Sequence, residues 1–382
     1  MENRVVVIVI SMNTVTDVFI IGGGPAGLAA AIAARQRGFD VVVADGACPP
    51  IDKPCGEGLL PDGRAALAQL GIHVPEIDSH PFRGIKFVSG GLRVEADFPN
   101  HSVNAAAIGV RRTVLHRIMI ARAQAAGVTL LWQTPVTGLY SQGVLLGKQK
   151  MNSRWIIGAD GGNSLVRRWA GVDAAHEKTR FAFRRHYRIA PWSDFMEIHW
   201  GPGCQIYITP VAHDEICVAL VSRDPHLRLD AALAAFPEIA SRLRNAPESS
   251  AERGAISSTR KLRQVYRDHI ALVGDASGAV DSITGEGLCL TFRQSIILAD
   301  CLAANNLPRY QRLHRAITRR PAMMARLLLA LDWKSSLRQR VMRAFQSDPR
   351  LFRRMVAMHV GSLSPLDFAA SGLSLGWRML NP

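Results

Sequence analysis

The feature that most constrains this chain is a glycine-rich turn between a short apolar strand and an alanine-rich helix. The turn reads Gly22-Gly-Gly-Pro-Ala-Gly27 and follows the β-branched and aromatic run 17–21. In a unit of this kind Gly22 permits the tight turn, Gly24 lets the backbone approach a pyrophosphate, and Gly27 lets helix and strand pack closely. The segment therefore predicts a dinucleotide-binding βαβ unit.

An acidic residue stands at the expected distance downstream of the turn. Residues 39–45 read as the second strand and end on Asp45. A carboxylate about 20 residues beyond the glycines can accept hydrogen bonds from ribose hydroxyls. Pro25 and Ala26 open the helix, whose free N–H groups and positive dipole end would face the phosphates. The alternative is a glycine-rich turn in an ordinary βαβ unit.

Size and cysteine usage limit the class of protein. With 382 residues, 48% of them hydrophobic, the chain suffices for about two domains and a large core. No apolar run approaches the ~20 residues that span a bilayer, and the run 5–10 lacks a cleavage-site pattern. Residues 1–11 are assigned no function. Six cysteines without Cys-x-x-Cys or metal-ligand spacing favour a reduced, cytoplasmic protein with no metal site.

The net charge of +15 is concentrated near the C-terminus. Residues 309–354 contain 13 Lys and Arg but only two acids, Asp332 and Asp348. No nucleic-acid motif accompanies them and aromatic residues are sparse, so no nucleic-acid partner is expected. A solvated charged face is one interpretation. The other is peripheral contact with anionic lipid, with 323–331 as the apolar side, which would suit a lipophilic substrate.

Strand and helix patterns alternate in three separate stretches. These stretches, 15–75, 106–178 and 265–308, predict a discontinuous Rossmann-like domain. Residues 76–105 and 179–264 instead carry short alternating strands, which predict an inserted antiparallel β-sheet domain that binds substrate. Residues 309–382 form the basic, helical C-terminal region of this α/β chain. Expected helices include 62–71, 108–127, 227–245 with an interruption at Pro237, and 291–304.

Three motifs stand in a characteristic order. They are the glycine turn, Gly158-Ala-Asp160-Gly161-Gly-Asn-Ser164-Leu-Val-Arg167, and Leu272-Val-Gly274-Asp275-Ala-Ser-Gly278. Together they resemble the FAD-dependent oxidoreductases of the p-hydroxybenzoate hydroxylase fold, which include aromatic hydroxylases, geranylgeranyl-type prenyl reductases and flavin-dependent halogenases. The resemblance covers residues 15–310. It implies an FAD-binding domain of the glutathione-reductase type, FAD as cofactor and NAD(P)H as reductant.

The third motif and the segment after it supply expected FAD contacts. Asp275 would accept hydrogen bonds from the ribityl hydroxyls, or it would be an N-cap of the next helix. Gly274 would let the chain pass close to the pyrophosphate. Gly285 and Gly287, which flank Glu286, would bring backbone N–H groups toward the flavin ring and favour negative charge on it.

Two further positions match FAD-binding residues of the hydroxylases. Arg112 corresponds to an arginine near the FAD phosphates, with a solvated arginine at a helix start as the alternative. Asp160 and Gly161 match the Asp-Gly motif that serves FAD and NAD(P)H binding. Asp160 alternatively pairs with Arg167 and holds the turn.

Departures from the family patterns bear on the reaction. Gly278 and Ser282 stand where aromatic hydroxylases carry His and Pro, whereas the segment Lys53-Pro-Cys-Gly56 resembles plant-type prenyl reductases. The segment 205–210 keeps only a tyrosine and the proline of the Tyr-x-Trp-x-Phe-Pro pattern of those reductases. It also lacks the Trp-x-Trp-x-Ile-Pro pattern of halogenases.

Four residues are candidates for catalysis. Cys55 could donate a proton, or be a small buried hydrophobe. Glu57 could be a general acid or base, or a charge near a helix start. Tyr207 could bind a phenolic oxygen, or be a core tyrosine, and Glu286 lies beside the expected flavin ring. Two histidines in the predicted substrate sheet, His186 and His199, are more typical of structural roles.

These observations leave three functions open. The first is an NAD(P)H-dependent FAD monooxygenase that hydroxylates an aromatic, polyketide-like or lipophilic small molecule. The second is a prenyl reductase that saturates C=C bonds of an isoprenoid lipid. The third is a flavin-binding protein without catalytic turnover.

Overall fold

The computed structural model describes residues 15–99, 106–175 and 178–363. Its first layer is an eight-stranded sheet centred on β1 (Val15–Ile21), which pairs in parallel with β2 (Val41–Ala44) and β11 (Gln149–Gly158). The flanking parallel strands are β8 (Thr129–Leu131) and β18 (Ile270–Leu272). Antiparallel strands complete the sheet: β9 (Gly138–Tyr140), β10 (Gly143–Leu146) and β17 (Tyr266–Arg267).

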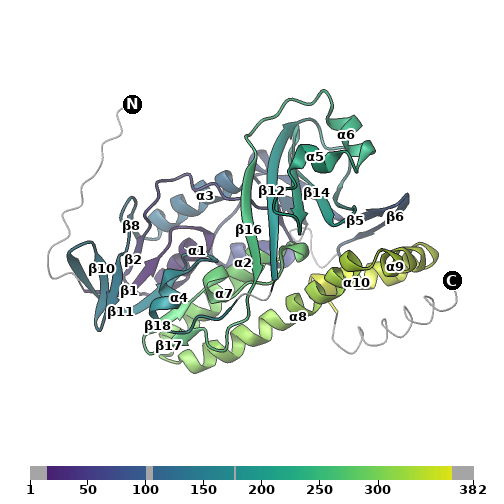
Figure 1. Cartoon of the computed structure of the whole chain (residues 1–382). Coiled ribbons are helices and arrows are strands. Elements are labelled where there is room, and N and C mark those ends of the chain that lie inside the picture. The colour runs from purple at the N-terminus through teal and green to yellow at the C-terminus, as the bar shows by residue number, and fades with distance from the viewer. Residues whose placement is uncertain (1–14, 100–105, 176–177, 364–382) are drawn as a thin grey trace.

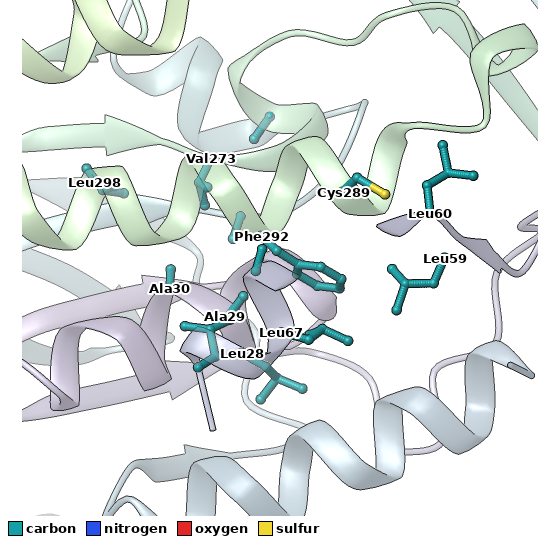
Figure 2. Close-up of a cluster of buried hydrophobic side chains, with 14 of the residues drawn as sticks. Leu28, Ala29, Ala30, Leu59, Leu60, Leu67, Val273, Cys289, Phe292 and Leu298 are labelled. Atoms are coloured by element: carbon teal, nitrogen blue, oxygen red, sulfur yellow. The ribbon is translucent and has the colours of Figure 1, made fainter. Parts of the chain in front are cut away.

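Helices cover this parallel sheet and bury its apolar strands. They are α1 (Pro25–Arg35), α2 (Pro61–Gln69), α3 (Arg112–Ala125), α4 (Leu165–Trp169) and α7 (Gly287–Ala303). The alanines of α1 are buried, which lets α7 pack closely against it. Figure 2 shows Phe292 of α7 beside Leu28 and Leu67, which come from α1 and α2. Segments separated by more than 200 residues therefore share one core.

The second layer is a seven-stranded sheet with the order β16-β12-β15-β14-β13-β5-β6 (Figure 1). Its strands lie within the ranges 76–105 and 179–264, except that β12 begins one residue earlier, at Lys178. The hairpin of β5 and β6 joins the sheet because β5 pairs in parallel with β13. The strands are β5 (Gly84–Ser89), β6 (Leu92–Asp97), β12 (Lys178–Arg188), β13 (Phe195–Trp200), β14 (Cys204–Ala212), β15 (Glu215–Ser222) and β16 (Arg253–Thr259).

One face of this second sheet is covered by two short helices, α5 (Leu229–Leu233) and α6 (Pro237–Leu243), which share a hydrophobic cluster with it. A small sheet of β3 (Gly58–Leu59), β7 (Ala107–Gly109) and β4 (His80–Phe82) contacts β14 of the second sheet. Gly109 is required there because a Cβ at this position would lie 1.7 Å from the carbonyl oxygen of Pro210 in β14.

Three helices complete the described chain: α8 (Leu307–Trp333), α9 (Ser335–Ser347) and α10 (Pro349–His359). Figure 1 shows α8 running along the molecule from α7 toward α9 and α10, and the last two contact β6. The inward sides of α8 and α10 are apolar, with Met324, Leu328 and Val356 buried. Within the described ranges, no helix is long and apolar enough to cross a membrane.

The predicted fold class is confirmed, with two corrections to element boundaries and one predicted helix break that the structure contains. The range 108–127 begins as strand β7 rather than as helix, because residues 107–109 pair with β3 and β4. The predicted interruption of the range 227–245 at Pro237 is confirmed: the range contains α5 and α6, and Pro237 is the first residue of α6. Helix α7 begins at Gly287, four residues before the expected start. Residues 1–11 and 364–382 lie outside the described residues.

Candidate active site

A cavity of about 1140 Å³ lies between the parallel sheet and the seven-stranded sheet. It is lined by the glycine turn, by the loop 51–58, by one face of the second sheet, and by α8 and α10. Most residues singled out from the sequence line it. They are Gly22, Gly24, Pro25, Ala26, Asp45, Cys55, Glu57, Arg112, Asp160, Gly161, Tyr207, Asp275, Gly285 and Gly287. Gly27, Gly274 and Glu286 do not line this cavity.

The glycine turn leaves space for a ligand at one position and none at another. A Cβ on Gly24 would meet no atom within 4 Å, whereas a Cβ on Gly27 would lie 1.8 Å from the carbonyl oxygen of Gly22. His116 stabilises the turn, because its Nε2 donates a hydrogen bond to the carbonyl oxygen of Gly23 at 2.8 Å. Burial lowers the pKa of His116, which favours this neutral form.

Asp45 lines the cavity and also shapes the turn. Its carboxylate accepts hydrogen bonds from the backbone N–H of Gly23 at 2.7 Å and of Ala47 at 2.8 Å. Each carboxylate oxygen keeps a further lone pair. Contact with a ribose therefore stays a prediction, to which the structure adds a positioning role.

Arg112 and Asp160 present polar atoms without protein partners. Arg112 lines the cavity, and its buried Nε has no hydrogen-bond partner among the described residues. The Oδ2 of Asp160 accepts from the N–H groups of Leu165 and Val166 and so holds the start of α4, while Oδ1 is buried and unpaired. The alternative pairing of Asp160 with Arg167 is wrong: Arg167 binds Asp173 at 2.6 Å.

This arrangement fits FAD. A guanidinium with unused donors suits the anionic pyrophosphate, and the open space at Gly24 admits it. A carboxylate with an unused acceptor, such as Asp160, suits hydroxyl or amide donors of the cofactor.

Asp275 lies in the 3-10 helix Gly274–Ser277 and opens onto the same cavity. Enclosure by protein raises the pKa of its carboxyl group, an effect that Arg112 and Lys53 oppose. Its side chain caps neither the 3-10 helix nor α7, so the N-cap alternative is wrong. A Cβ on Gly274 would lie 2.7 Å from the Cβ of Ala26, so this glycine permits close packing against the turn.

Cys55 borders the cavity beside a buried carboxylate. Its Sγ accepts a hydrogen bond from the backbone N–H of Glu57 at 3.4 Å. Burial raises the pKa of the Cys55 thiol, although Arg112 opposes the shift, so the thiol keeps its proton near neutral pH. A protonated thiol therefore lines the cavity at this position; its role as a proton donor stays a prediction.

Glu57 is buried and bonded through both carboxylate oxygens. Oε1 accepts from the backbone N–H of Arg112 at 3.0 Å, and Oε2 lies 2.6 Å from Nε2 of His186. Its backbone has a φ of +58°, in the left-handed region. Glu57 therefore joins the cofactor-side loop to the second sheet, a role that leaves little capacity for general acid–base work.

The tautomer of His186 follows from its neighbours. Its Nδ1 lies 3.1 Å from a guanidinium nitrogen of Arg111 and 3.1 Å from one of Arg184. A guanidinium only donates, so Nδ1 accepts and Nε2 carries the proton that it donates to Glu57. The sequence marked His186 only as a histidine in the predicted substrate sheet. It gave no indication that Arg184 and Arg111 would lie beside this histidine.

The same cluster includes Cys217, and donor atoms of Glu57, His186 and Cys217 lie within 4.8 Å of one another. The donors do not suit a cation. Nε2 of His186 is occupied by a proton, two guanidiniums adjoin the ring, and burial raises the pKa of the Cys217 thiol well above its usual range. We therefore assign this cluster to hydrogen bonding.

The other two catalytic candidates have structural partners. The hydroxyl of Tyr207 donates to the carbonyl oxygen of Ile283 at 3.0 Å, and burial raises its pKa well above the usual range. Glu286 does not line the cavity. Its Oε1 accepts from Arg320 of α8 at 3.1 Å, and its Oε2 lies 3.5 Å from Nδ1 of His359 in α10. Burial raises the pKa of Glu286 as well.

The cavity continues into an apolar chamber that the sequence did not reveal. One wall consists of alternate residues of β5 and β13, namely Ile85, Phe87, Met196 and Ile198. The opposite wall consists of Met324 and Leu328 from α8 and Met355 and Val356 from α10. Alternation in the strands marked one face of the sheet, but no local signal showed that α8 and α10 would cover it.

Comparisons with known proteins agree with this geometry. The family model described as FAD binding domain matches residues 15–327. A menaquinone reductase of Mycobacterium tuberculosis is 28% identical over 326 residues, covering 78% of this chain and 79% of that protein. A digeranylgeranylglycerophospholipid reductase of Methanosphaera stadtmanae is 27% identical over 296 residues, covering 72% of this chain and 74% of that protein.

Among solved structures, the flavin-dependent brominase Bmp2 matches with a TM-score of 0.78 and 19% identity, covering 95% of this chain and 98% of that chain. At this identity the similarity shows a shared fold. The family model, by contrast, spans most of the chain and all the motifs that line the cofactor side of the cavity. The chain therefore belongs to the FAD binding domain family and is an FAD-dependent oxidoreductase.

Proposed function

We propose that this oxidoreductase is a reductase that saturates a C=C bond of an isoprenoid-type lipid, with NAD(P)H as the source of electrons. The observation that carries the proposal is the apolar chamber that continues from the FAD side of the cavity. Its walls are aliphatic, methionine and phenylalanine side chains from β5, β13, α8 and α10. Such walls suit a flexible hydrocarbon chain.

Saturation of a C=C bond adds a hydride to one carbon and a proton to the other. When bound, reduced FAD supplies the hydride. The protonated thiol of Cys55 borders the cavity and supplies the proton. Glu57 and His186 hold the loop that carries Cys55, and the apolar chamber excludes water and fixes the chain.

The curated relatives support this choice. Those reported above are named as reductases of menaquinone and of digeranylgeranylglycerophospholipid, and both names denote molecules with isoprenoid chains. The Lys53-Pro-Cys-Gly56 segment also lines the cavity, as a loop that delivers Cys55. The basic surface of α8 to α10 would suit peripheral contact with an anionic membrane in which such a lipid resides.

Hydroxylation is the second candidate. Asp160 and Gly161, which match the Asp-Gly motif of the hydroxylases, line the cavity. Tyr207 also lines the cavity. Its hydroxyl could bind an aromatic substrate once its hydrogen bond to the carbonyl oxygen of Ile283 is broken. A monooxygenase would use the same enclosed chamber to keep water from the reacting centre.

Product analysis with the FAD-loaded protein separates the candidates. The protein is reduced by NAD(P)H without oxygen and mixed with a geranylgeranyl lipid or a menaquinone. A C=C reductase reoxidises the flavin under these conditions, and the prenyl chain of the product gains two hydrogen atoms. Reduction of the quinone ring to a quinol also adds two hydrogen atoms, so the product is reoxidised in air before its mass is measured. A monooxygenase needs oxygen, and its product gains one oxygen atom derived from labelled oxygen gas. Absence of turnover with both classes of substrate would leave the non-catalytic flavin-binding protein.

A further inference from the structure

The apolar chamber ends at one aromatic side chain. Phe87 of β5 lines the cavity and is 2% exposed. Its ring lies 5.6 Å from the ring of Trp200 and 5.0 Å from that of Phe352, both in edge-on geometry. Trp200 and Phe352 are buried and do not line the cavity. Phe87 therefore separates the chamber from a solid aromatic cluster behind it.

The register of the sheet places Phe87 at one end of a row. Phe87 pairs with Ile198, Ile198 with Tyr207, and Tyr207 with Ala219. All of these side chains line the cavity. The row continues to Arg184 of β12, at the polar side near Glu57. Three strand spacings separate Ala219 from Phe87, about 14 Å at ~4.8 Å each.

The opposite wall meets Phe87 at the same end. Phe352 and Val356 are one helical turn apart on α10, so they share a helix face. Val356 lines the chamber, while Phe352 supports Phe87 from behind. The same helix thus provides part of the wall and the support for the end of the chamber.

We propose that Phe87 is the specificity-determining residue that limits the length of the hydrocarbon chain. The proposal deepens the function proposed above, from which it takes the lipid class of substrate. A chain that enters from the flavin side would extend along the row until its end meets the Phe87 ring. Removal of the ring would open space toward Phe352 and Trp200, so longer chains would fit.

The test measures binding of saturated prenyl alcohols of increasing length to the oxidised, FAD-loaded protein, followed by equilibrium dialysis. These alcohols have no C=C bond, so binding does not depend on the reductase activity. For wild type, affinity should rise with length and then fall at the length that meets Phe87. In F87A and in the milder F87L, the fall should move to longer chains, with the long-to-short affinity ratio changing roughly tenfold or more.

Two further variants sharpen the result. V356F adds a ring to the chamber wall and should move the fall to shorter chains. F98A is the matched control, because Phe98 is buried against Phe82 and does not line the cavity. It removes the same ring and should keep the wild-type length profile.

An unchanged profile in both F87A and F87L, with normal FAD content, would overturn the proposal. So would the absence of saturable binding by any alcohol to wild type. Failure of the reductase proposal would appear elsewhere, as oxygen incorporation or no turnover in product analysis, while the length dependence of binding would persist.

Discussion

The carboxylate of Glu57 and the imidazole of His186 form a buried contact of 2.6 Å, although 129 residues separate them in the chain. Glu57 belongs to the loop that borders the FAD side of the cavity, and His186 lies in β12 of the second sheet. Both side chains are 1% exposed. The pair therefore fixes the loop that carries Cys55 against the seven-stranded sheet.

Substitution of Glu57 by Gln should destabilise the protein strongly. Glutamine keeps the shape but removes the negative charge that lies 3.9 Å from Nε of Arg184. Arg184 keeps Asp52 as an acidic partner, but the hydrogen bonds from His186 and from the backbone N–H of Arg112 lose their charged acceptor. The expected cost is about 2 kcal/mol in the free energy of unfolding. Urea denaturation of the apoprotein measures it. E95Q, at an exposed position of β6, should change little; an equally small change in E57Q would contradict the assignment.

Two glycine substitutions should have opposite consequences. In G24A the added methyl group meets no protein atom within 4 Å, so the unfolding free energy of the apoprotein should stay within about 0.5 kcal/mol of wild type, while FAD affinity falls. In G27A the methyl group would clash with Gly22, so the apoprotein itself should be destabilised. Chemical denaturation and FAD titration of both variants provide the data. Normal FAD binding by G24A would show that the pyrophosphate lies elsewhere.

Removal of Arg112 should weaken FAD binding. Its guanidinium borders the cavity with Nε unpaired by protein, so R112A should raise the FAD dissociation constant roughly tenfold to a hundredfold. The matched control is R117A on the same helix, which removes an exposed arginine paired with Asp78. Fluorescence titration with FAD compares them. Equal FAD affinities in the two variants would favour the alternative that Arg112 is a solvated arginine at a helix start.

The proton-donor role of Cys55 predicts a pH profile. Because burial raises the thiol pKa, the rate of substrate reduction should be level through neutral pH and fall as the pH rises through that raised value. In C55A this decrease of the rate at high pH should disappear, and the rate of substrate reduction should be about 10²–10⁴-fold lower than in wild type. Its flavin should still be reduced by NAD(P)H at the normal rate. C48A, which alters an exposed cysteine, serves as control; a wild-type profile in C55A would exclude the role.

Glu197 should stabilise the fold at neutral pH and lose this effect in acid. Burial alone would raise its pKa, but the hydrogen bond and charge of His199, with Lys86, lower it from 4.5 to about 2. A lowered carboxyl pKa stabilises the folded state above pH 4.5, by about 3 kcal/mol, and the effect disappears as the pH falls to about 2. The difference in unfolding free energy between wild type and E197Q should shrink over this interval. If this difference in unfolding free energy stayed constant with pH, the ion pair of Glu197 with His199 would not stabilise the fold.

The sequence by itself determined the cofactor side of this protein. Gly22, Gly24 and Gly27 act within one strand–turn–helix unit, so their spacing specifies their roles before any distant contact forms. Asp160 follows β11 of the same parallel sheet, whereas Arg112 is the first residue of α3 and follows β7 of the small sheet. The resemblance to the hydroxylase motifs, rather than local geometry, predicted these two positions, and both line the cavity.

The tertiary structure alone decided the substrate side. Phe87 lines the chamber only because β5 pairs in parallel with β13, more than 100 residues away, and because α10 covers the sheet. The Glu57–His186 pair depends on the same docking. Long-range pairing of this kind depends on which apolar surfaces fit together. The local periodicity of the sequence does not show which surfaces those are.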